Sequence, residues 1–537
     1  MNPSSRIFVV NNIKLPVCAS FKEAFSVAKR KLRAVGVSSP QQFRIYRRSV
    51  DARNKSNICF VYSVSASALD IPLSDNELSS HGIGRIVDND AVIPESGEEK
   101  LTAPPVIIGA GPSGLFAALL LAEAGYNPVI IERGGDVGAR IKAYERFIRE
   151  HILDSETNIQ FGAGGAGTFS DGKLVTRIND PITSYVLERF VEFGAPEDIL
   201  YIAKPHIGTD ILTSVVDNMI SHIVRLGGKI LYNTRFERPL FSKGKAVAVK
   251  TTAGDIPAGA LVLALGHSAR DTYMNLIDVG LSLEAKSFSV GMRVEHLASD
   301  IDEAMYGKMA GHPALGHAEY NLSHNTAVRG VYTFCMCPGG EVVAAASECG
   351  GVVVNGMSKR KRDGKNSNSA VCCTVFKEDF GGTPLGAIEY QRNIERLAYN
   401  AGGGGYRAPI ITLGDFINGK LETEPKRIKP TYMGGNNVKL ASPEQYLPKT
   451  VTEAIRNSFS AFDKRIAGFA ASDAVLTGPE TRTSAPIRIL RNNETRAAIG
   501  YDNIYPAGEG AGYAGGITSA SVDGIKTAIA IIKKYRP

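Results

Sequence analysis

A glycine-rich segment at residues 105–134 has the residue types and spacing needed to hold a dinucleotide. Gly109, Gly111 and Gly114 follow a short apolar run, and Glu132 ends the next one. In this pattern the first glycine makes a tight turn, the second lets a pyrophosphate approach the backbone, and the third lets a helix pack closely on the strand. The residues predicted to contact the dinucleotide here are Gly109, Gly111, Pro112, Ser113, Gly114, Glu132 and Arg133.

The charge of Glu132 restricts the kind of dinucleotide. Its carboxylate would accept hydrogen bonds from the adenosine ribose, and it would repel a 2′-phosphate, which argues against NADP at this site. The free N–H groups at the start of the helix that follows Gly111 would bind the phosphates.

The far end of the chain indicates FAD rather than NAD. Residues 503–535 read as a strand, a glycine-rich turn and a helix. Ala507-Gly508-Glu509 resembles the strand end with which flavoproteins of the glutathione-reductase type close their FAD site. That resemblance implies that Glu509 binds the ribityl chain and that a helix starting at Gly516-Ile517 faces the flavin pyrimidine. The positive end of that helix would favour the reduced flavin.

Two segments between these ends complete the predicted cofactor site. Residues 161–174 are rich in glycine, which gives a backbone able to wrap a ligand. Residues 229–271 read as a β-meander followed by a buried strand, and the superfamily pattern places the end of such a strand beside the cofactor. The residues predicted to contribute from these two segments are Gly164, Gly165, Thr168, Ser170, Lys173, Phe236 and Gly266.

Four residues are candidates for the chemistry itself: His267, Cys335, Cys337 and Arg482. His267 follows the strand end at Gly266 and would be a proton donor with a physiological pKa, or a structural residue. Arg482 would clamp an anionic substrate, or would pair with an acid at a domain interface.

The two cysteines allow two interpretations. In an extended strand their Cα atoms would be about 6.6 Å apart, the upper edge for a disulfide. They are either thiols that pack and line the substrate site or a redox pair that works with the flavin. Cysteine and histidine residues nowhere have the spacing of metal ligands, so no metal site is predicted.

Composition excludes several classes of protein. The chain has 537 residues, 44% hydrophobic and 21% charged, with a net charge of +7. This is the composition of a folded globular protein, not of a disordered one. The sequence contains no long apolar run and no signal-peptide pattern, so no membrane span is expected. Seven scattered cysteines are typical of a reducing, cytoplasmic compartment.

The motifs predict an α/β protein with a discontinuous cofactor domain. A Rossmann-like FAD domain is expected at 101–290 and 485–537, because its two motifs lie about 400 residues apart in the chain. Residues 291–484 would be an inserted α+β substrate domain. Residues 1–70 would be a small basic α+β domain, joined to the rest by a linker at 71–104.

Two polar tracts are less specific. Residues 22–55 hold ten Lys or Arg and two acids, which indicates a solvated face or a docking surface for an anionic partner. The tract SKRKRDGKNSNS at 358–369 reads as an exposed loop.

Taken together, the longer motifs resemble one family. The segments that carry the resemblance are FGAGGAGTFSDGKL (161–174), LALGHSARDTY (263–273), SVGMRVEH (289–296), TFCMCPGGEVVAAASE (333–348), GPETRTSAPIRILR (478–491) and PAGEGAGYAGGI (506–517). They are similar to those of the bacterial FAD-dependent dehydrogenases, of the glutathione-reductase-type FAD fold. The resemblance spans nearly the whole chain and implies FAD and oxidoreductase activity, but no particular substrate.

The sequence therefore predicts an oxidoreductase that transfers hydride or electrons through a non-covalent FAD. Only one dinucleotide fingerprint is present, so the other redox partner is a small-molecule substrate, NAD(P)H held without that motif, or a partner protein. Two other classes remain open: a flavin-dependent RNA-modifying protein, which the basic N-terminal domain favours, and a non-catalytic flavin-binding or electron-carrier protein. The oligomeric state is left open.

Overall fold

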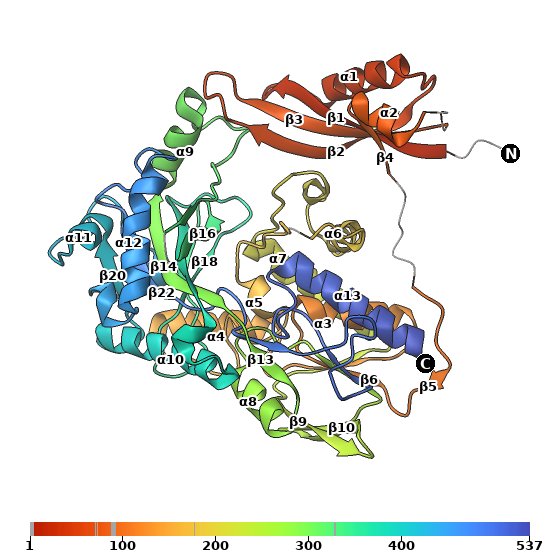
Figure 1. Ribbon diagram of the computed structural model, residues 1–537, viewed down its shortest axis with the longest axis vertical. Helices are drawn as coiled ribbons and strands as arrows, with labels where there is room; N and C mark the ends of the chain where they lie inside the picture. Colours follow the sequence, from red (N-terminus) through yellow and green to blue (C-terminus); the bar gives the residue numbers. More distant parts are fainter. Residues whose placement is uncertain (1–4, 70, 72, 87–92, 177, 327–328) are drawn as a thin grey trace.

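Figure 1 shows the fold as a computed structural model, which describes residues 5–69, 71, 73–86, 93–176, 178–326 and 329–537. A five-stranded parallel sheet has the order β24-β12-β6-β7-β8. Its strands are β6 (Pro105–Ile108), β7 (Val129–Ile131), β8 (Lys229–Leu231), β12 (Ala260–Leu263) and β24 (Ile504–Pro506). β24 comes from the far end of the chain and pairs with β12, so the two predicted motifs end on neighbouring parts of one sheet.

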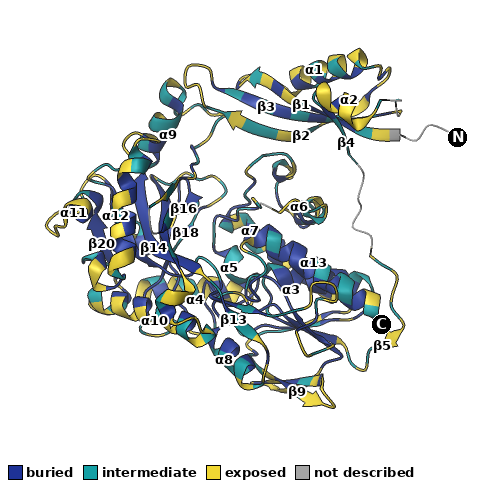
Figure 2. Ribbon diagram, viewed as in Figure 1, coloured by how far each residue is buried: buried dark blue, intermediate teal, exposed yellow. Residues whose placement is uncertain are grey.

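Two helices of this sheet pack closely against each other. α3 (Pro112–Glu123) follows β6, and α13 (Ile517–Lys534) follows β24. A Cβ placed on Gly524 of α13 would lie 2.1 Å from the carbonyl oxygen of Ser113, so the helices can approach this closely only because Gly524 has no side chain. Figure 2 shows α3 buried along most of its length, in agreement with ten buried residues among its twelve.

A second, smaller sheet and several helices lie around the five-stranded parallel sheet. The predicted β-meander is a separate antiparallel sheet of β9 (Phe236–Ser242), β10 (Lys245–Thr251) and β11 (Gly254–Pro257). The surrounding helices are α4 (Val137–Glu150), α5 (Gly165–Thr168), α6 (Ile182–Glu192), α7 (Thr209–Arg225) and α8 (Arg270–Asp278).

A second large sheet has seven strands in the order β15-β16-β19-β14-β22-β20-β21. Its strands are β14 (Phe288–Leu297), β15 (Ser323–Asn325), β16 (Gly330–Cys337), β19 (Asn366–Val375), β20 (Ala408–Thr412), β21 (Val438–Leu440) and β22 (Val475–Glu480). All pairs are antiparallel except β20 with β21. The adjoining elements are α9 (Ala298–Tyr306), α10 (Pro384–Ala401), α11 (Leu413–Asn418), α12 (Lys449–Asp463), β17 (Glu341–Ala344) and β18 (Val354–Met357).

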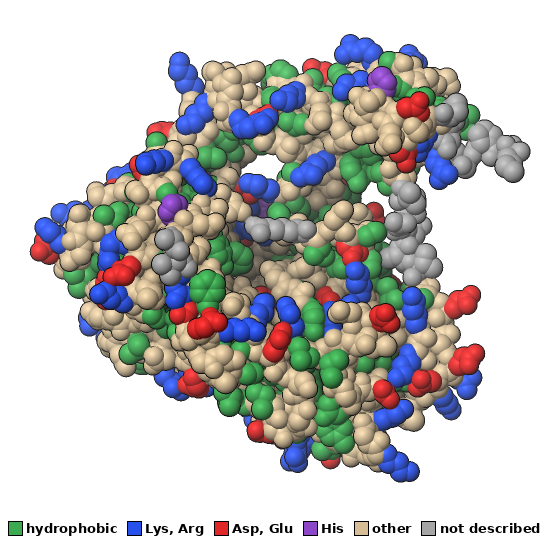
Figure 3. Space-filling view, viewed as in Figure 1, with side chains coloured by type: hydrophobic (Ala, Val, Ile, Leu, Met, Phe, Trp, Pro, Cys, Tyr) green, Lys and Arg blue, Asp and Glu red, His purple; other side chains and the backbone are tan. Residues whose placement is uncertain are grey.

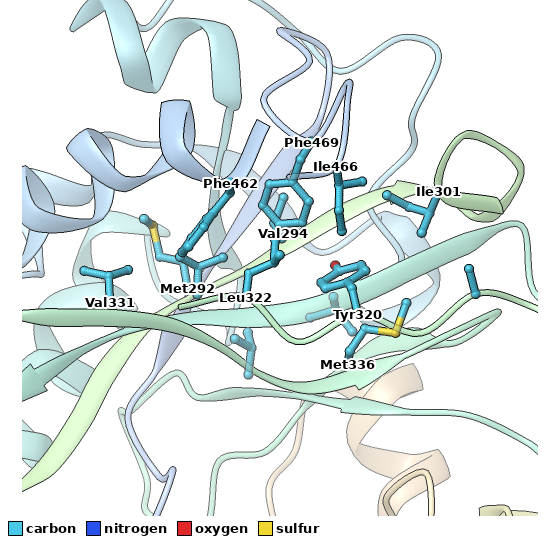
Figure 4. Close-up of a cluster of buried hydrophobic side chains, with 14 of the residues drawn as sticks. Met292, Val294, Ile301, Tyr320, Leu322, Val331, Met336, Phe462, Ile466 and Phe469 are labelled. Atoms are coloured by element: carbon cyan, nitrogen blue, oxygen red, sulfur yellow. The ribbon is translucent and has the colours of Figure 1, made fainter. Parts of the chain in front are cut away.

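An apolar core fills the space between this sheet and its helices. Figure 4 shows Phe462 of α12 and Phe469 beside Met292 and Val294 of β14, with Tyr320 next to them. The rings of Phe462 and Phe469 meet edge to face, with centroids 5.7 Å apart. Burial of such side chains is the main force that holds the α12 layer to the sheet.

A short two-stranded sheet joins the two large sheets. β13 (Leu283–Ala285) leads into the seven-stranded sheet and β23 (Ile487–Ile489) leads out of it. They pair antiparallel, with Leu283 opposite Ile489 and Ala285 opposite Ile487. The chain therefore enters and leaves the seven-stranded part at the same place.

The N-terminal part is a four-stranded sheet with two helices. Its strand order is β2-β3-β1-β4. The elements are β1 (Ser5–Pro16), α1 (Phe21–Ala34), β2 (Gln41–Asp51), β3 (Cys59–Leu69), α2 (Asp75–Ser80) and β4 (Ile83–Ile86). The prediction of a linker over all of 71–104 is therefore wrong for 75–86, because Leu78 and Ile83 are buried in the core of this sheet. Residues 87–92 of that expected linker lie outside the described residues.

Backbone hydrogen bonds attach this N-terminal part to the rest. The N–H of Arg48 donates to Tyr201 and the N–H of Ala203 donates to Arg48, over 2.7 and 2.9 Å. Figure 3 shows an opening beside this contact, between the N-terminal sheet and the body of the protein. The basic side chains of α1 and β2, such as Lys29 and Arg44, are exposed.

The tract at 358–369 differs from its predicted state. It was expected as an exposed loop, but Ser358 is buried and residues 366–369 begin β19 in the middle of the large sheet. Arg362 is held by carboxylates of Asp171 and Glu319. Arg360 is likewise paired with Asp198, whereas Lys359, Lys361, Asp363 and Lys365 are exposed, as predicted for the loop part of the tract.

None of the helices in the described part of the chain is both long enough and apolar enough to cross a membrane.

Candidate functional site

One cavity runs from the carboxyl ends of the parallel strands to the face of the seven-stranded sheet. Strand ends of an α/β sheet are where such folds bind ligands. The predicted residues that line it are Gly109, Gly111, Pro112, Ser113, Glu132, Arg133, Gly165, Ser170, Lys173, Phe236, Gly266, His267, Cys335, Arg482, Glu509, Gly516 and Ile517. Segments from six distant stretches of the chain therefore meet around one space.

The three fingerprint glycines have three different surroundings. A Cβ on Gly109 would lie 2.3 Å from the carbonyl oxygen of Ala264, and one on Gly114 would lie 2.0 Å from that of Gly109. Both glycines are therefore required by packing. A Cβ on Gly111 would meet no described atom closer than the Cα of Gly165, at 3.9 Å. The space in front of Gly111 belongs to the cavity.

Two polar groups beside this turn are arranged for a ligand. The carboxylate of Glu132 accepts hydrogen bonds from the N–H groups of Ala110, Gly134 and Gly162, over 2.8 to 3.0 Å. A carboxylate offers about four lone-pair sites, so Glu132 is held in place with acceptor capacity left. The hydroxyl of Ser113 is buried and has no hydrogen-bond partner among the described residues. An unpaired polar atom at a helix N-terminus that lines a cavity suits a phosphate.

The C-terminal element closes the opposite wall. Gly508 has a φ of +75°, and a Cβ there would lie 2.7 Å from that of Ser113, so this turn is pressed against α3. A Cβ on Gly516 would meet no described atom within 4 Å, which leaves the start of α13 open to the cavity. Burial raises the pKa of Glu509 to about 7.

Ion pairs hold the side of the cavity around Glu132 and Arg133. Arg133 lies 4.2 Å above the ring of Phe161 and pairs with Glu156 and Asp271, over 3.0 and 2.9 Å. Phe236 is buried and lines the same cavity. Arg133 therefore has a fixed position beside Glu132.

Five of the predicted site residues lie close to the cavity but do not line it. They are Gly114, Gly164, Thr168, Cys337 and Gly508. Gly164 packs against α7, since a Cβ there would lie 2.9 Å from a methyl group of Val216. Thr168 faces a second, smaller apolar cavity beside α7. These residues shape the site from behind.

Lys173 is held by an acid that sequence reasoning missed. Its ammonium lies 2.8 Å from the carboxylate of Asp171, which is fully buried. Asp171 also accepts from Arg362, over 2.6 Å. Lys173 and Arg362 outweigh the effect of burial and lower the pKa of Asp171 to about 2. Asp171 is therefore a carboxylate at neutral pH and fixes Lys173 at the cavity.

His267 lines the cavity as a neutral imidazole. Its Nδ1 is 2.9 Å from the hydroxyl of Ser268. Burial, together with the positive charges of Arg482 and Arg270, lowers the pKa of His267 to about 3. The physiological pKa expected from the sequence is therefore wrong, because two arginines disfavour the imidazolium.

We expect His267 to show no titration between pH 5 and 8 when followed by NMR of histidine-labelled protein, with His267→Gln used to assign its resonance. His317 is the internal control, because its hydrogen bond to Asp302, over 2.7 Å, raises its pKa. The unfolded chain takes up a proton at His267 near pH 6.5, so this residue costs stability progressively as the pH falls from there toward 3. A His267 resonance that titrates near neutrality would contradict the prediction.

Arg482 lies at the cavity but is already paired. Its guanidinium forms a double ion pair with Glu395 of α10, with the closer contact at 3.0 Å, and donates to Ser268 over 3.0 Å. Glu395 also binds Arg270, over 2.7 Å. Of the two interpretations, the geometry favours the ion pair over the substrate clamp. Arg488, six residues further along the chain, pairs with Glu284 at 3.3 Å.

The cysteine pair stands where the seven-stranded sheet meets the cavity. Both thiols are free, Cys335 lines the cavity, and Cys337 is fully buried behind it. Phe334 of the same strand, Asn355 of β18 and Glu480 of β22 also line the cavity; sequence reasoning missed Phe334 and Asn355. Glu480 binds Arg293 over 2.6 Å, and burial raises its pKa to about 7.

Three parts of the chain match known protein families. Residues 107–170 match a family described as an NAD(P)-binding Rossmann-like domain, and residues 287–483 match one described as an FAD-dependent protein, C-terminal domain-like. Residues 9–67 match a domain of unknown function. The fold and the site thus define an FAD-dependent oxidoreductase with a mixed α/β architecture.

One relative extends over the whole chain. An uncharacterized protein of Clostridium beijerinckii is 44% identical over 537 residues, which cover 98% of each chain. The chain belongs to the same family, the bacterial FAD-dependent dehydrogenases.

Solved structures resemble the chain more distantly. Glycine oxidase from Bacillus cereus has a TM-score of 0.35 and 11% identity, over 81% of this chain and 98% of that one. L-amino acid deaminase from Proteus vulgaris has a TM-score of 0.33 and 14% identity, over 83% and 97%. CtdE, solved in complex with FAD, has a TM-score of 0.32 and 12% identity, over 80% and 84%.

Proposed function

We propose that this oxidoreductase transfers hydride or electrons between a non-covalent FAD and a small substrate that binds between the flavin and the seven-stranded sheet. The observation that carries the proposal is the single cavity shared by the dinucleotide turn, the start of α13, and the ends of β16 and β22. When bound, FAD supplies a ring that accepts or donates two electrons. The protein positions this ring and provides the groups that surround it.

The residues around the cavity support one direction for the bound FAD. Glu132 and Phe236 would hold the adenosine, while Gly111 and Ser113 would face the pyrophosphate. The start of α13 at Gly516 would face the flavin, because its free N–H groups and positive dipole end suit a ring that gains negative charge on reduction. The flavin ring would then lie next to Cys335.

The same arrangement supports a division into domains. Residues 101–290 and 485–537 would form a FAD domain of the glutathione-reductase type, supported by the five parallel strands and the separate β9–β11 sheet. Residues 291–484 would form the inserted substrate domain, supported by the seven-stranded sheet. Residues 1–86 would form the N-terminal domain, since β4 completes its sheet.

The substrate end of the cavity is polar. Asn355, Glu480 and Lys173 line it. With a pKa near 7, Glu480 is able to hold or release a proton at neutral pH. The neutral His267 has a ring nitrogen available as a hydrogen-bond acceptor or donor. These groups fit a substrate that exchanges a proton together with its electrons.

An absorbance spectrum of the purified protein tests the proposal first. We expect a yellow protein that releases FAD on denaturation, with bleaching of the flavin when a substrate is added without oxygen. A panel of metabolites, tested one by one, identifies the substrate class. Absence of flavin, or release of FMN, would refute the cofactor assignment.

The same preparation separates the other two classes of function. Turnover with an artificial electron acceptor distinguishes an enzyme from an electron carrier. RNA binding that weakens as salt is added would instead favour the RNA-modifying class.

A further inference from the structure

An irregularity in β16 brings two cysteines together at the flavin end of the cavity. β16 and β19 pair in register as far as Phe334 and Ala370, but Cys337 then pairs with Asn368, one residue out of step. Cys335 has a φ of +45°, a conformation uncommon for residues other than glycine. In a regular strand the Cα atoms of the two cysteines would be about 6.6 Å apart. A bulge changes the direction in which the side chains of such residues point. Here the thiol of Cys337 donates to the carbonyl of Cys335, over 3.4 Å.

Two cations lie against this pair. The sulfur of Cys337 is 3.7 Å from the ammonium of Lys173 and 3.9 Å from the guanidinium of Arg293. Asp171 and Glu480 fix these cations in place, at 2.8 and 2.6 Å. Positive neighbours stabilise a thiolate, which is the reactive form of cysteine.

The two thiols differ in their surroundings. A hydrogen bond between the two cysteine side chains, with Lys173 and Arg293, holds the pKa of Cys335 well below its ordinary value, whereas that side-chain bond and burial raise the pKa of Cys337. Cys372 and Cys373 of β19 are also buried, and burial raises the pKa of both. The thiol that faces the cavity is thus the one whose ionised form is stabilised.

We propose that Cys335 and Cys337 are a redox pair that exchanges two electrons with the flavin and closes to a disulfide when oxidised. The inference rests on the proposed function, because it needs the flavin at the Gly516 end of the cavity. On oxidation both S–H bonds break and one S–S bond forms. Two electrons and one proton pass to the oxidised flavin, and the second proton is released. The reverse reaction opens the disulfide.

An anaerobic titration of the oxidised holoenzyme with dithionite tests the pair. We expect the wild type to take up four electrons per FAD, two for the flavin and two for the disulfide, because each is a two-electron couple. Cys335→Ser and Cys337→Ser should each take up two while keeping FAD. Cys372→Ser is the matched control and should take up four. A wild type that takes up two, or a Cys335→Ser variant that takes up four, would overturn the proposal.

A second measurement does not depend on the flavin or on the variants. After treatment of the wild-type chain with diamide, we expect mass spectrometry to show the peptide that contains residues 335–337 lighter by two hydrogen atoms and protected from alkylation. If this peptide remains fully alkylated, the redox pair is refuted whether or not FAD is bound. If the pair closes but the purified protein contains no FAD, the proposed function fails instead.

Discussion

Replacing Gly111 by valine is expected to abolish FAD binding and to leave the fold intact. The backbone of Gly111 is extended, with φ −79° and ψ −179°, which a β-branched residue adopts easily. A Cβ there is 3.9 Å from the nearest described atom, the Cα of Gly165, so the protein itself accommodates the side chain. The added methyl groups occupy the path of the pyrophosphate. We expect a loss of affinity of at least about 100-fold, roughly 2.7 kcal/mol.

Titration of flavin-free protein with FAD, followed by fluorescence, measures this effect. Gly84→Val in β4 is the matched control, because a Cβ at Gly84 also meets no described atom within 4 Å but lies in the N-terminal sheet. Both variants should unfold at the temperature of the flavin-free wild type. If Gly111→Val binds FAD as tightly as the wild type does, this turn does not hold the pyrophosphate.

Replacing Glu395 by glutamine should have the largest effect on stability. Glu395 is 1% exposed and binds two buried arginines, Arg270 and Arg482. Glutamine has nearly the same size, so the change removes the charge and leaves both guanidinium groups without their main partner. Breaking a buried ion pair from one side typically costs about 3 to 5 kcal/mol of unfolding free energy. Arg482 would also lose its fixed place at the cavity.

The pH dependence of the unfolding free energy provides a second test of the role of Glu395. The two arginines hold the pKa of Glu395 well below its ordinary range. Its stabilising contribution is therefore complete above the ordinary carboxyl pKa of about 4.3 and is lost as the pH falls below it. Urea unfolding at pH 7 and pH 4 should show a smaller acid loss in Glu395→Gln than in the wild type.

Glu389→Gln on the same helix is the control. Glu389 is 56% exposed and pairs with Arg392 on the same helix and, at 3.8 Å, with Arg396, which is 60% exposed. Such a pair contributes little, so the change should stay within about 0.5 kcal/mol. Equal losses of unfolding free energy in the two variants would show that the stabilising effect of Glu395 does not depend on its buried ion pairs.

Local patterns in the sequence correctly predicted the glycine-rich turn and the strand and helix on either side of it. The roles of Gly109 and Gly114 follow from one turn and its two neighbouring elements, and the structure places both where packing requires a glycine. The strand, turn and helix around Glu509 are equally local. Such features are predictable because they depend on residues a few positions apart.

The partners of these residues were not predictable in the same way. Asp171 and Arg362 are 191 positions apart in the sequence, and Glu395 and Arg270 are 125 positions apart. No local sequence pattern links residues that far apart. The pKa of His267 depends on Arg482, which only the assembled fold brings near. The short strand β4 was missed because it has only four residues, of which Ile83 alone is buried in the core once the strand pairs with β1.

The pairing of β13 with β23 gives the chain a modular architecture. Ala285 and Ile487 are direct partners, so some two hundred residues leave and return at one point of the nucleotide-binding part. In evolution, a stretch that leaves and returns at one point can be exchanged for another without changing the path of the chain on either side. Exchange of that stretch replaces one wall of the cavity and leaves the glycine turn on the other wall unchanged.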